Sequence, residues 1–269
     1  MILNAVILGI IEGLTEFLPV SSTGHLIIAN RFIKLDNGFE AVFNIVIQFG
    51  AILAVAVYFR KEIFPAGIFS GNAGKREGEI KRVYSLWKKI IIAFIPAAVI
   101  GIFIEDILEK YLFNTASVSA ALIAGAFLML YSEKFRKRDM TENASAITIK
   151  QALAIGFFQC LAMWPGMSRS ASTIAGGLFA GLSRSLAAEF SFFLGIPTIM
   201  AASLYKLYKT GFAISPQQWV SLAAGTLVSF AVALLVVRFF MNYLKRKGLA
   251  PFAVYRIVLG LVILIFFEF

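Results

Sequence analysis

Long apolar segments recur along this chain, and its polar residues gather in the stretches between them. Six segments are apolar over close to the roughly 20 residues that a helix needs to cross the hydrocarbon core of a bilayer. They are residues 40–59, 89–105, 117–133, 187–208, 218–237 and 251–268. A soluble domain does not need such uninterrupted runs, so the pattern predicts a polytopic membrane protein built from helices.

Two further apolar segments, residues 2–29 and 150–180, are helical in period but are interrupted midway by Pro, Gly and Ser. Two half-length helices joined by a polar turn fit a re-entrant hairpin better than a full crossing. Irregular backbone at membrane depth is tolerated only where protein or water satisfies it. We therefore expect an all-α fold with about six transmembrane helices and two re-entrant helical hairpins.

The two halves of the chain resemble each other. Residues 7–23 (ILGIIEGLTEFLPVSST) align with residues 154–170 (AIGFFQCLAMWPGMSRS). We interpret the chain as a single integral membrane domain, residues 1–269, with internal repeats of about 1–140 and 148–269. Three crossings per repeat is an odd number, so the second repeat enters from the opposite face and the topology is inverted. The two hairpins should then meet near the midplane of the membrane.

The positive charge of the chain is concentrated between the apolar segments. The formal net charge is +10, but only 15% of the residues are charged, against roughly 25% in soluble domains. Lys and Arg cluster in the predicted loops 60–89, 134–150 and 238–247. An excess of basic residues marks cytoplasmic loops, which puts both termini outside. The charge therefore indicates orientation, and we expect membrane lipids rather than nucleic acid as partners.

The break in the first hairpin, EGLTEFLPVSSTGH, contains two carboxylates inside an apolar sequence. Each charge near the centre of a transmembrane helix costs roughly 2.5–3.5 kcal/mol, which favours a functional role. Glu12 and Glu16 are four residues apart and share one helix face. Two carboxylates this close either share a proton or bind a divalent cation. Mg²⁺ takes phosphate oxygens of the substrate as further ligands beside one or two carboxylates. The alternative is a salt bridge that only pins the hairpin.

Hydroxyl groups follow the carboxylates in the same break. Ser21, Ser22, Thr23 and Gly24 should begin the second half-helix, where free backbone N–H groups bind phosphate; Ser and Thr are also good N-caps, so capping alone is the alternative. The next residue, His25, is the only histidine of the chain. Either Ser22 attacks a substrate with His25 as its base, or His25 itself attacks.

The break in the second hairpin supplies the opposite charge. Ser168, Arg169 and Ser170 again place hydroxyls at a predicted helix start, now with an arginine. A guanidinium at membrane depth is a natural bidentate partner for phosphate. Pairing with Glu12 or Glu16 across the repeat interface is the alternative to phosphate binding.

Other polar residues of the apolar segments invite simpler interpretations. We expect Arg184 and Glu189 to pair with each other near the cytoplasmic boundary. Arg256 lies in the last apolar segment and should snorkel to the interface. Asn44 and Gln48 either line the cavity or form hydrogen bonds between helices.

Together these groups predict phosphoryl transfer on a lipid phosphate. Two helix starts, an arginine and a carboxylate pair for metal suit a transferring phosphoryl group. The rival hypothesis is a lipid-phosphate transporter or flippase, because inverted repeats with broken helices are equally typical of secondary transport. The Ser22 and His25 couple favours an enzyme, because transport needs no nucleophile.

Both breaks resemble the signature segments of a known family. EGLTEFLPVSSTGH and PGMSRSASTIAGG are similar to those of the bacterial undecaprenyl-diphosphatase family, which is linked to bacitracin resistance. The resemblance implies hydrolysis of undecaprenyl diphosphate to undecaprenyl phosphate and inorganic phosphate, which recycles the carrier lipid for peptidoglycan synthesis. It also implies a Mg²⁺ or Ca²⁺ requirement and a site on the periplasmic side of the bacterial cytoplasmic membrane. Assembly as a homodimer stays open. The motifs map onto Glu12, Glu16, Ser22 and His25, and onto Ser168, Arg169 and Ser170.

Overall fold

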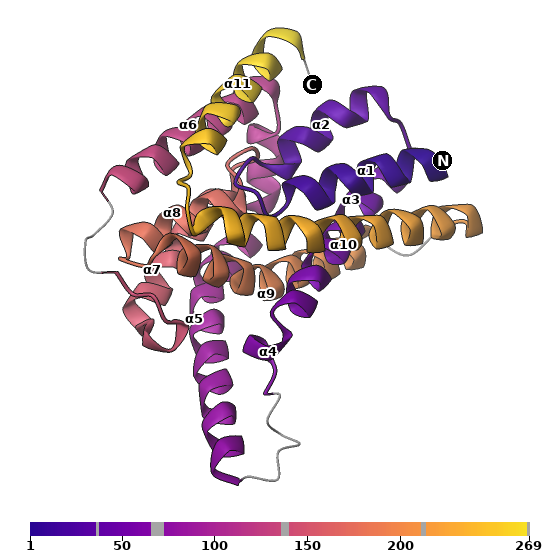
Figure 1. Cartoon of the computed structure of the whole chain (residues 1–269). Helices are drawn as coiled ribbons and strands as arrows, with labels where there is room; N and C mark the ends of the chain where they lie inside the picture. Colours follow the sequence, from indigo (N-terminus) through magenta and orange to yellow (C-terminus); the bar gives the residue numbers. More distant parts are fainter. Residues whose placement is uncertain (36–37, 66–72, 136–139, 211–213, 268–269) are drawn as a thin grey trace.

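The computed structural model describes residues 1–35, 38–65, 73–135, 140–210 and 214–267. Within these ranges the chain folds into helices, and the only β pairing there is an isolated bridge between Thr141 and Leu182. The elements in chain order are α1 (Ile2–Thr15), α2 (Ser22–Phe32), α3 (Phe39–Tyr58), α4 (Arg60–Ile63), α5 (Ala73–Leu112), α6 (Thr115–Lys134), η2 (Ala144–Ala146), α7 (Ile149–Cys160), η3 (Leu161–Met163), α8 (Arg169–Phe179), α9 (Arg184–Thr210), α10 (Pro216–Leu244) and α11 (Ala250–Phe266) (Figure 1).

Each of the six predicted crossings is a helix, which confirms the all-α polytopic membrane fold. Within the described residues, α5, α6, α9 and α10 are long and apolar enough to cross a bilayer. Of the other two, α3 has a shorter apolar stretch, Val42–Tyr58, and α11 has 17 residues. A helix of that length lies at the lower end of the range that spans hydrocarbon.

The first basic loop is partly helical, which corrects the prediction of a loop over residues 60–89. The short helix α4 covers its start, and α5 begins at Ala73 and runs through the rest. Figure 1 shows this N-terminal part of α5 extending away from the other helices. An exposed i,i+4 ion pair between Glu77 and Lys81, at 2.6 Å, supports the helix in this segment. Residues 66–72 of this cluster, and 136–139 of the second, lie outside the described residues.

The two hairpins are both interrupted as predicted. The first consists of α1 and α2, and the second of α7, η3 and α8. Close helix contacts hold the first hairpin: α1 packs on α10 and α10 on α3. Small residues permit this approach, since a Cβ on Gly9 would overlap the backbone of Gly225. In the second hairpin, α8 packs on both α7 and α9. The hairpins are thus fixed to longer helices.

The predicted pair between Arg184 and Glu189 is wrong. Arg184 instead forms a bidentate ion pair with Glu133 at the end of α6, and its Nε donates to Glu133 Oε1 at 2.7 Å. Five residues along a helix turn through about 140°, so residues 184 and 189 face different ways. Glu133 also accepts a hydrogen bond from the backbone N–H of Leu249 at 3.1 Å. This cluster joins the ends of α6, α9 and α11.

Candidate active site

A cavity of about 790 Å³ lies where the two breaks meet, with α5 and α9 as further walls. This volume is typical of a small-molecule site. Apolar residues of α5, η3 and α9 line most of it. Its polar lining residues are Glu16, Ser21, Ser22, Thr23, Gln48, Gln159, Ser168, Arg169 and Thr198. The structure therefore brings predicted site residues from both hairpins together in one cavity.

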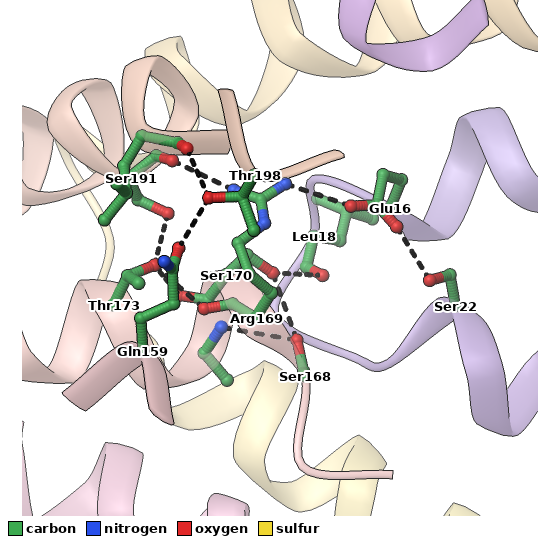
Figure 2. Close-up of polar contacts among 12 residues, drawn as sticks. Glu16, Leu18, Ser22, Gln159, Ser168, Arg169, Ser170, Thr173, Ser191 and Thr198 are labelled. Atoms are coloured by element: carbon green, nitrogen blue, oxygen red, sulfur yellow. Dashed lines mark hydrogen bonds and ion pairs between the residues drawn. The ribbon is translucent and has the colours of Figure 1, made fainter. Parts of the chain in front are cut away.

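Glu16 connects the two hairpins (Figure 2). Its Oε1 accepts a hydrogen bond from Arg169 Nη2 at 3.0 Å, and its Oε2 accepts one from Ser22 Oγ at 2.8 Å. The side chains of the ion pair are only 9% and 11% exposed. The predicted alternative of a salt bridge across the repeat interface is thus confirmed for Glu16. The same carboxylate is placed to accept the proton of Ser22.

Arg169 is held firmly by its surroundings. Its Nη1 donates to the carbonyl of Ser191 at 2.9 Å, and its guanidinium lies 5.8 Å from the centroid of the Phe17 ring, in a cation–π contact. A Cβ on Gly195 would come within 2.8 Å of Arg169 Nη1, so the guanidinium would have to shift if that glycine were replaced. The third guanidinium nitrogen, Nε, is buried and has no acceptor among the described residues. The arginine is therefore fixed, with its Nε–H unpaired within the described part of the chain.

Glu12 lies behind Glu16 and is fully buried. Both of its carboxylate oxygens lack a hydrogen-bond partner in the part of the chain that the structure describes. A buried carboxylate without a partner is costly, and a shared proton or a bound cation would remove that cost. No cluster of three or more His, Cys, Asp or Glu occurs within the described ranges. The observation that bears on a cation is therefore the unpartnered Glu12 carboxylate, since Mg²⁺ commonly takes one or two carboxylates and completes its ligands from substrate and water.

The two serines that begin α2 and α8 have the same unusual backbone. Ser21 has φ 72° and Ser168 has φ 71°, and they are the non-glycine residues with positive φ among those described. Each caps its helix, because Ser21 Oγ accepts from the N–H of Gly24 and Ser168 Oγ from that of Ala171, both at 3.3 Å. Such strained residues cluster at functional sites. N-capping is confirmed at both positions, and both serines also line the cavity.

The remaining predicted phosphate-binding residues divide into two groups. Thr23 lines the cavity, whereas Gly24 and Ser170 are not among its lining residues. Gly24 is buried and its N–H is used by the Ser21 cap. Ser170 is fully buried, and its hydroxyl donates to the carbonyl of Leu18 at 3.1 Å. That contact crosses from the second break to the first, so Ser170 ties the two turns together.

His25 is turned away from Ser22, and the predicted Ser22–His25 couple is not formed. Its Nδ1 lies 2.7 Å from the carbonyl oxygen of Ser21, and its Nε2 lies 2.7 Å from the hydroxyl of Tyr255. The two rings are nearly parallel, at 5°, with centroids 5.6 Å apart. Side chains of a helix tilt toward its N-terminus, which directs this ring over the Ser21 carbonyl. The group that contacts the Ser22 hydroxyl is Glu16.

Arg256 does not snorkel to the interface, which corrects the sequence prediction. Its side chain is fully buried in α11. It donates at 2.8–3.4 Å to the carbonyls of Pro19, Ala121, Leu122, Gly166 and Met167. Breaks in helices free backbone carbonyls that need donors at membrane depth. Arg256 satisfies such carbonyls in both breaks, and so holds the two turns against α6.

Sequence reasoning also left several polar residues around the cavity unresolved or unnoticed. Gln48 lines the cavity, as one alternative predicted, but Asn44 is not among its lining residues. Gln159 was aligned with Glu12 but given no role; its Oε1 accepts from Thr198 Oγ1 at 3.2 Å. Thr198 and Tyr255 were not singled out. A polar side chain within an apolar helix is the signal that would have found them.

The family can now be assigned from comparisons with known proteins. The family model described as bacitracin resistance protein BacA matches residues 5–262. The chain belongs to this family. Undecaprenyl-diphosphatase 1 of Clostridioides difficile is 48% identical over 268 residues, which cover 99% of this chain and 96% of that protein. The undecaprenyl-diphosphatases of Thermoanaerobacter sp. and Limosilactobacillus fermentum are 48% and 44% identical, with 98% and 99% of this chain covered and 96% and 97% of theirs.

Both predicted motifs of this BacA-family chain fall inside the matched region. The first break carries Glu12, Glu16, Ser22 and His25, and the second carries Arg169. The cavity and the family assignment therefore concern the same residues.

Proposed function

We propose that this protein hydrolyses undecaprenyl diphosphate to undecaprenyl phosphate and inorganic phosphate, and so recycles the carrier lipid for cell-wall synthesis. The observation that carries the proposal is the chain of contacts from Arg169 to Glu16 to Ser22 at the polar end of a largely apolar cavity. Nucleophilic attack on a phosphate needs a positive charge, a base and a hydroxyl group, and Arg169, Glu16 and Ser22 provide these three in contact with one another. The names of the relatives agree with this activity.

The shape of the cavity supports a lipid substrate. Its polar end suits a diphosphate, and its apolar walls, which include Ile102 and Ile199, suit an isoprenoid tail. The cavity also reaches Leu108 and Phe113 near the end of α5, and Tyr205 near the end of α9. The distribution of basic residues puts these helix ends on the outer side. We therefore place the opening on the periplasmic side of a bacterial cytoplasmic membrane.

Ser22 acts as the nucleophile in this proposal, with Glu16 as its base. Ser22 Oγ attacks the terminal phosphorus while Glu16 accepts its proton, and Arg169 stabilises the charge that develops on the phosphoryl oxygens. The bond to the bridging oxygen breaks, and its electron pair leaves with undecaprenyl phosphate, which takes up the proton. Water then attacks the phosphoserine, a proton returns to Ser22 Oγ through Glu16, and inorganic phosphate is released.

A divalent cation, Mg²⁺ or Ca²⁺, would be held by Glu12 and Glu16 in this account. The support is the buried Glu12 carboxylate, whose oxygens have no partner among the described residues. Bound there, the cation would neutralise charge on the substrate phosphates. We assign His25 to the turn rather than to proton transfer from Ser22, because its Nδ1 contacts the Ser21 carbonyl. Assembly as a homodimer stays a prediction.

Phosphate release from a long-chain polyprenyl diphosphate tests the activity. Purified protein in detergent should release inorganic phosphate, and a chelator should stop it. Ser22→Ala should lower kcat at least about a thousandfold, as loss of a nucleophile does. Ser119→Ala is the matched control, because Ser119 is also buried, has an unpartnered hydroxyl in the described structure and lies away from the cavity. A folded wild type that releases no phosphate would favour lipid translocation instead.

A further inference from the structure

Gln159 is the second-to-last residue of α7, just before the second break in the chain, and nothing in the proposed reaction uses it. Its side chain is 2% exposed, yet it belongs to the lining of the cavity. Oε1 lies 3.2 Å from Thr198 Oγ1, whose single proton it shares with the carbonyl of Leu194 at 2.7 Å. Nε2 is buried and has no acceptor among the described residues. An amide is thus held by its oxygen with its two N–H donors left over.

A buried donor without an acceptor is expensive to keep. Leaving such a group unsatisfied costs about 1–3 kcal/mol, and most buried polar groups in proteins are paired. Arg169 presents the same situation, since its Nε is also buried without an acceptor in the described ranges. Both residues line one cavity. Two unpaired donors in one place call for a ligand rich in acceptor oxygens.

One face of α9 holds both donor side chains, Arg169 and Gln159, in position. Arg169 contacts the carbonyl of Ser191 and lies against Gly195, and Gln159 contacts Thr198. Positions 191, 195 and 198 follow one another at helical spacing. Figure 2 shows Gln159, Thr198 and Arg169 grouped beside Ser191, with Glu16 and Ser22 farther along. The amide therefore extends the row of polar groups beyond the arginine.

The next lining residues after this amide are apolar. Ala162 and Met163 follow Gln159 along the chain, and Ile199 and Ala202 follow Thr198; all four line the cavity. Gln159 thus stands where the polar end of the cavity changes into its apolar wall. In a prenyl diphosphate, the phosphate at that junction is the one esterified to the tail.

We propose that Gln159 is a substrate-binding residue whose Nε2 donates to the ester phosphate, with Thr198 holding the amide in that orientation. The proposal rests on the proposed function. Ser22, Glu16 and Arg169 then act on the terminal phosphate. The phosphate that stays with the lipid is bound by a neutral donor, the amide of Gln159. A neutral donor suits this position, because the ester phosphate must also leave with the product.

The test compares two substitutions at the same position. Gln159→Met keeps the length and packing of the side chain but cannot donate. Gln159→Glu keeps the acceptor for Thr198 but places a carboxylate where the amide donors were. The matched control is Gln217→Met, at an exposed position in α10. Thermal unfolding in detergent checks that each variant is folded, and phosphate release from a prenyl diphosphate gives kcat and KM.

Binding of the ester phosphate should be lost with little change in the chemical step. Gln159→Met should raise KM about tenfold, the effect of one hydrogen bond to a charged group, and leave kcat within about twofold, because uniform binding affects KM alone. Gln159→Glu should raise KM further. Inhibition by prenyl monophosphate should weaken about tenfold, whereas inhibition by inorganic phosphate should not change. Thr198→Val should give a smaller shift in the same direction.

Three results would overturn the proposal. Wild-type KM in folded Gln159→Met would mean that the amide does not touch substrate. Wild-type KM in Gln159→Glu would mean that the group facing the ligand accepts rather than donates. Equal weakening of inhibition by prenyl monophosphate and by inorganic phosphate would remove the assignment to the ester phosphate. Activity of the wild type decides the proposed function separately from all three.

Discussion

The first and second breaks share a backbone and differ in charge. Ser21 and Ser168, which the internal alignment pairs, cap their helices with nearly the same φ of 72° and 71°. The first break carries Glu12 and Glu16, whereas the second has Gln159 in place of Glu12 and adds Arg169. In the proposed reaction, the first turn would supply the nucleophile, its base and the ligands for a cation, and the second would supply donors for phosphate. On this proposal, the same local backbone structure would serve both halves of a phosphoryl-transfer site.

Removing the charge of the second break should have the largest effect. Arg169→Ala should lower kcat about 100–1000-fold, because a buried donor to the transition state is lost. Arg169→Lys should recover only part of it, since an ammonium lacks the planar fork that contacts Glu16 and Ser191. Phosphate-release kinetics measure both. Full rescue by lysine would show that charge alone matters in the second break.

Removing the negative charges of Glu12 and Glu16 in the first break should weaken binding of the proposed cation. Glu12→Gln should raise the Mg²⁺ concentration needed for half-maximal activity at least about tenfold. Glu16→Gln should in addition lower kcat at saturating Mg²⁺, because Glu16 also accepts the Ser22 proton. Metal titrations after chelation distinguish the two. An unchanged metal response in Glu12→Gln would remove the cation from Glu12.

Replacing Arg256 should destabilise both breaks at once. Arg256→Met removes the side-chain donor from the carbonyls of Pro19, Gly166 and Met167 in the two breaks, and should destabilise the fold by at least about 3 kcal/mol. Arg256→Lys should be intermediate, because an ammonium has three donors. Thermal unfolding in detergent gives the order. A variant Arg256→Met as stable as wild type would show that the breaks do not depend on α11.

A small effect is expected where α11 meets only the first break. Tyr255→Phe keeps the ring beside His25 and removes the hydroxyl that contacts Nε2. Loss of one partly exposed hydrogen bond should lower kcat/KM about threefold. The pH dependence of kcat/KM should keep its shape if His25 only supports the turn. A shift of the pH dependence of kcat/KM in Tyr255→Phe would show that His25 takes part in proton transfer.

Sequence could predict the parts of this molecule that depend on local pattern. The apolar runs predicted the helices, and Pro, Gly and Ser predicted both breaks. The pair of Glu16 with Arg169 was within reach as an alternative, because a buried arginine needs an anion. These inferences use spacing and composition over a few turns.

The rest depends on contacts that spacing does not determine. His25 and Tyr255 are 230 residues apart, and Arg256 reaches Pro19 across 237. The partner of Ser22 was mistaken for another reason. Ser22 reaches back to Glu16 through a turn in which Ser21 has positive φ, and a helical spacing argument cannot represent such a turn. Long-range packing and an irregular turn therefore account for the corrected predictions.

The central claim is that the two breaks form one catalytic unit, and a double-mutant cycle tests it most directly. The measurement is kcat/KM for Ser22→Ala, Arg169→Ala and the double variant, with Ser119→Ala as control. Residues that act as one unit are strongly non-additive. We predict that the double variant loses little more than Ser22→Ala alone. Losses that multiply, with each substitution keeping its full effect in the presence of the other, would contradict the account.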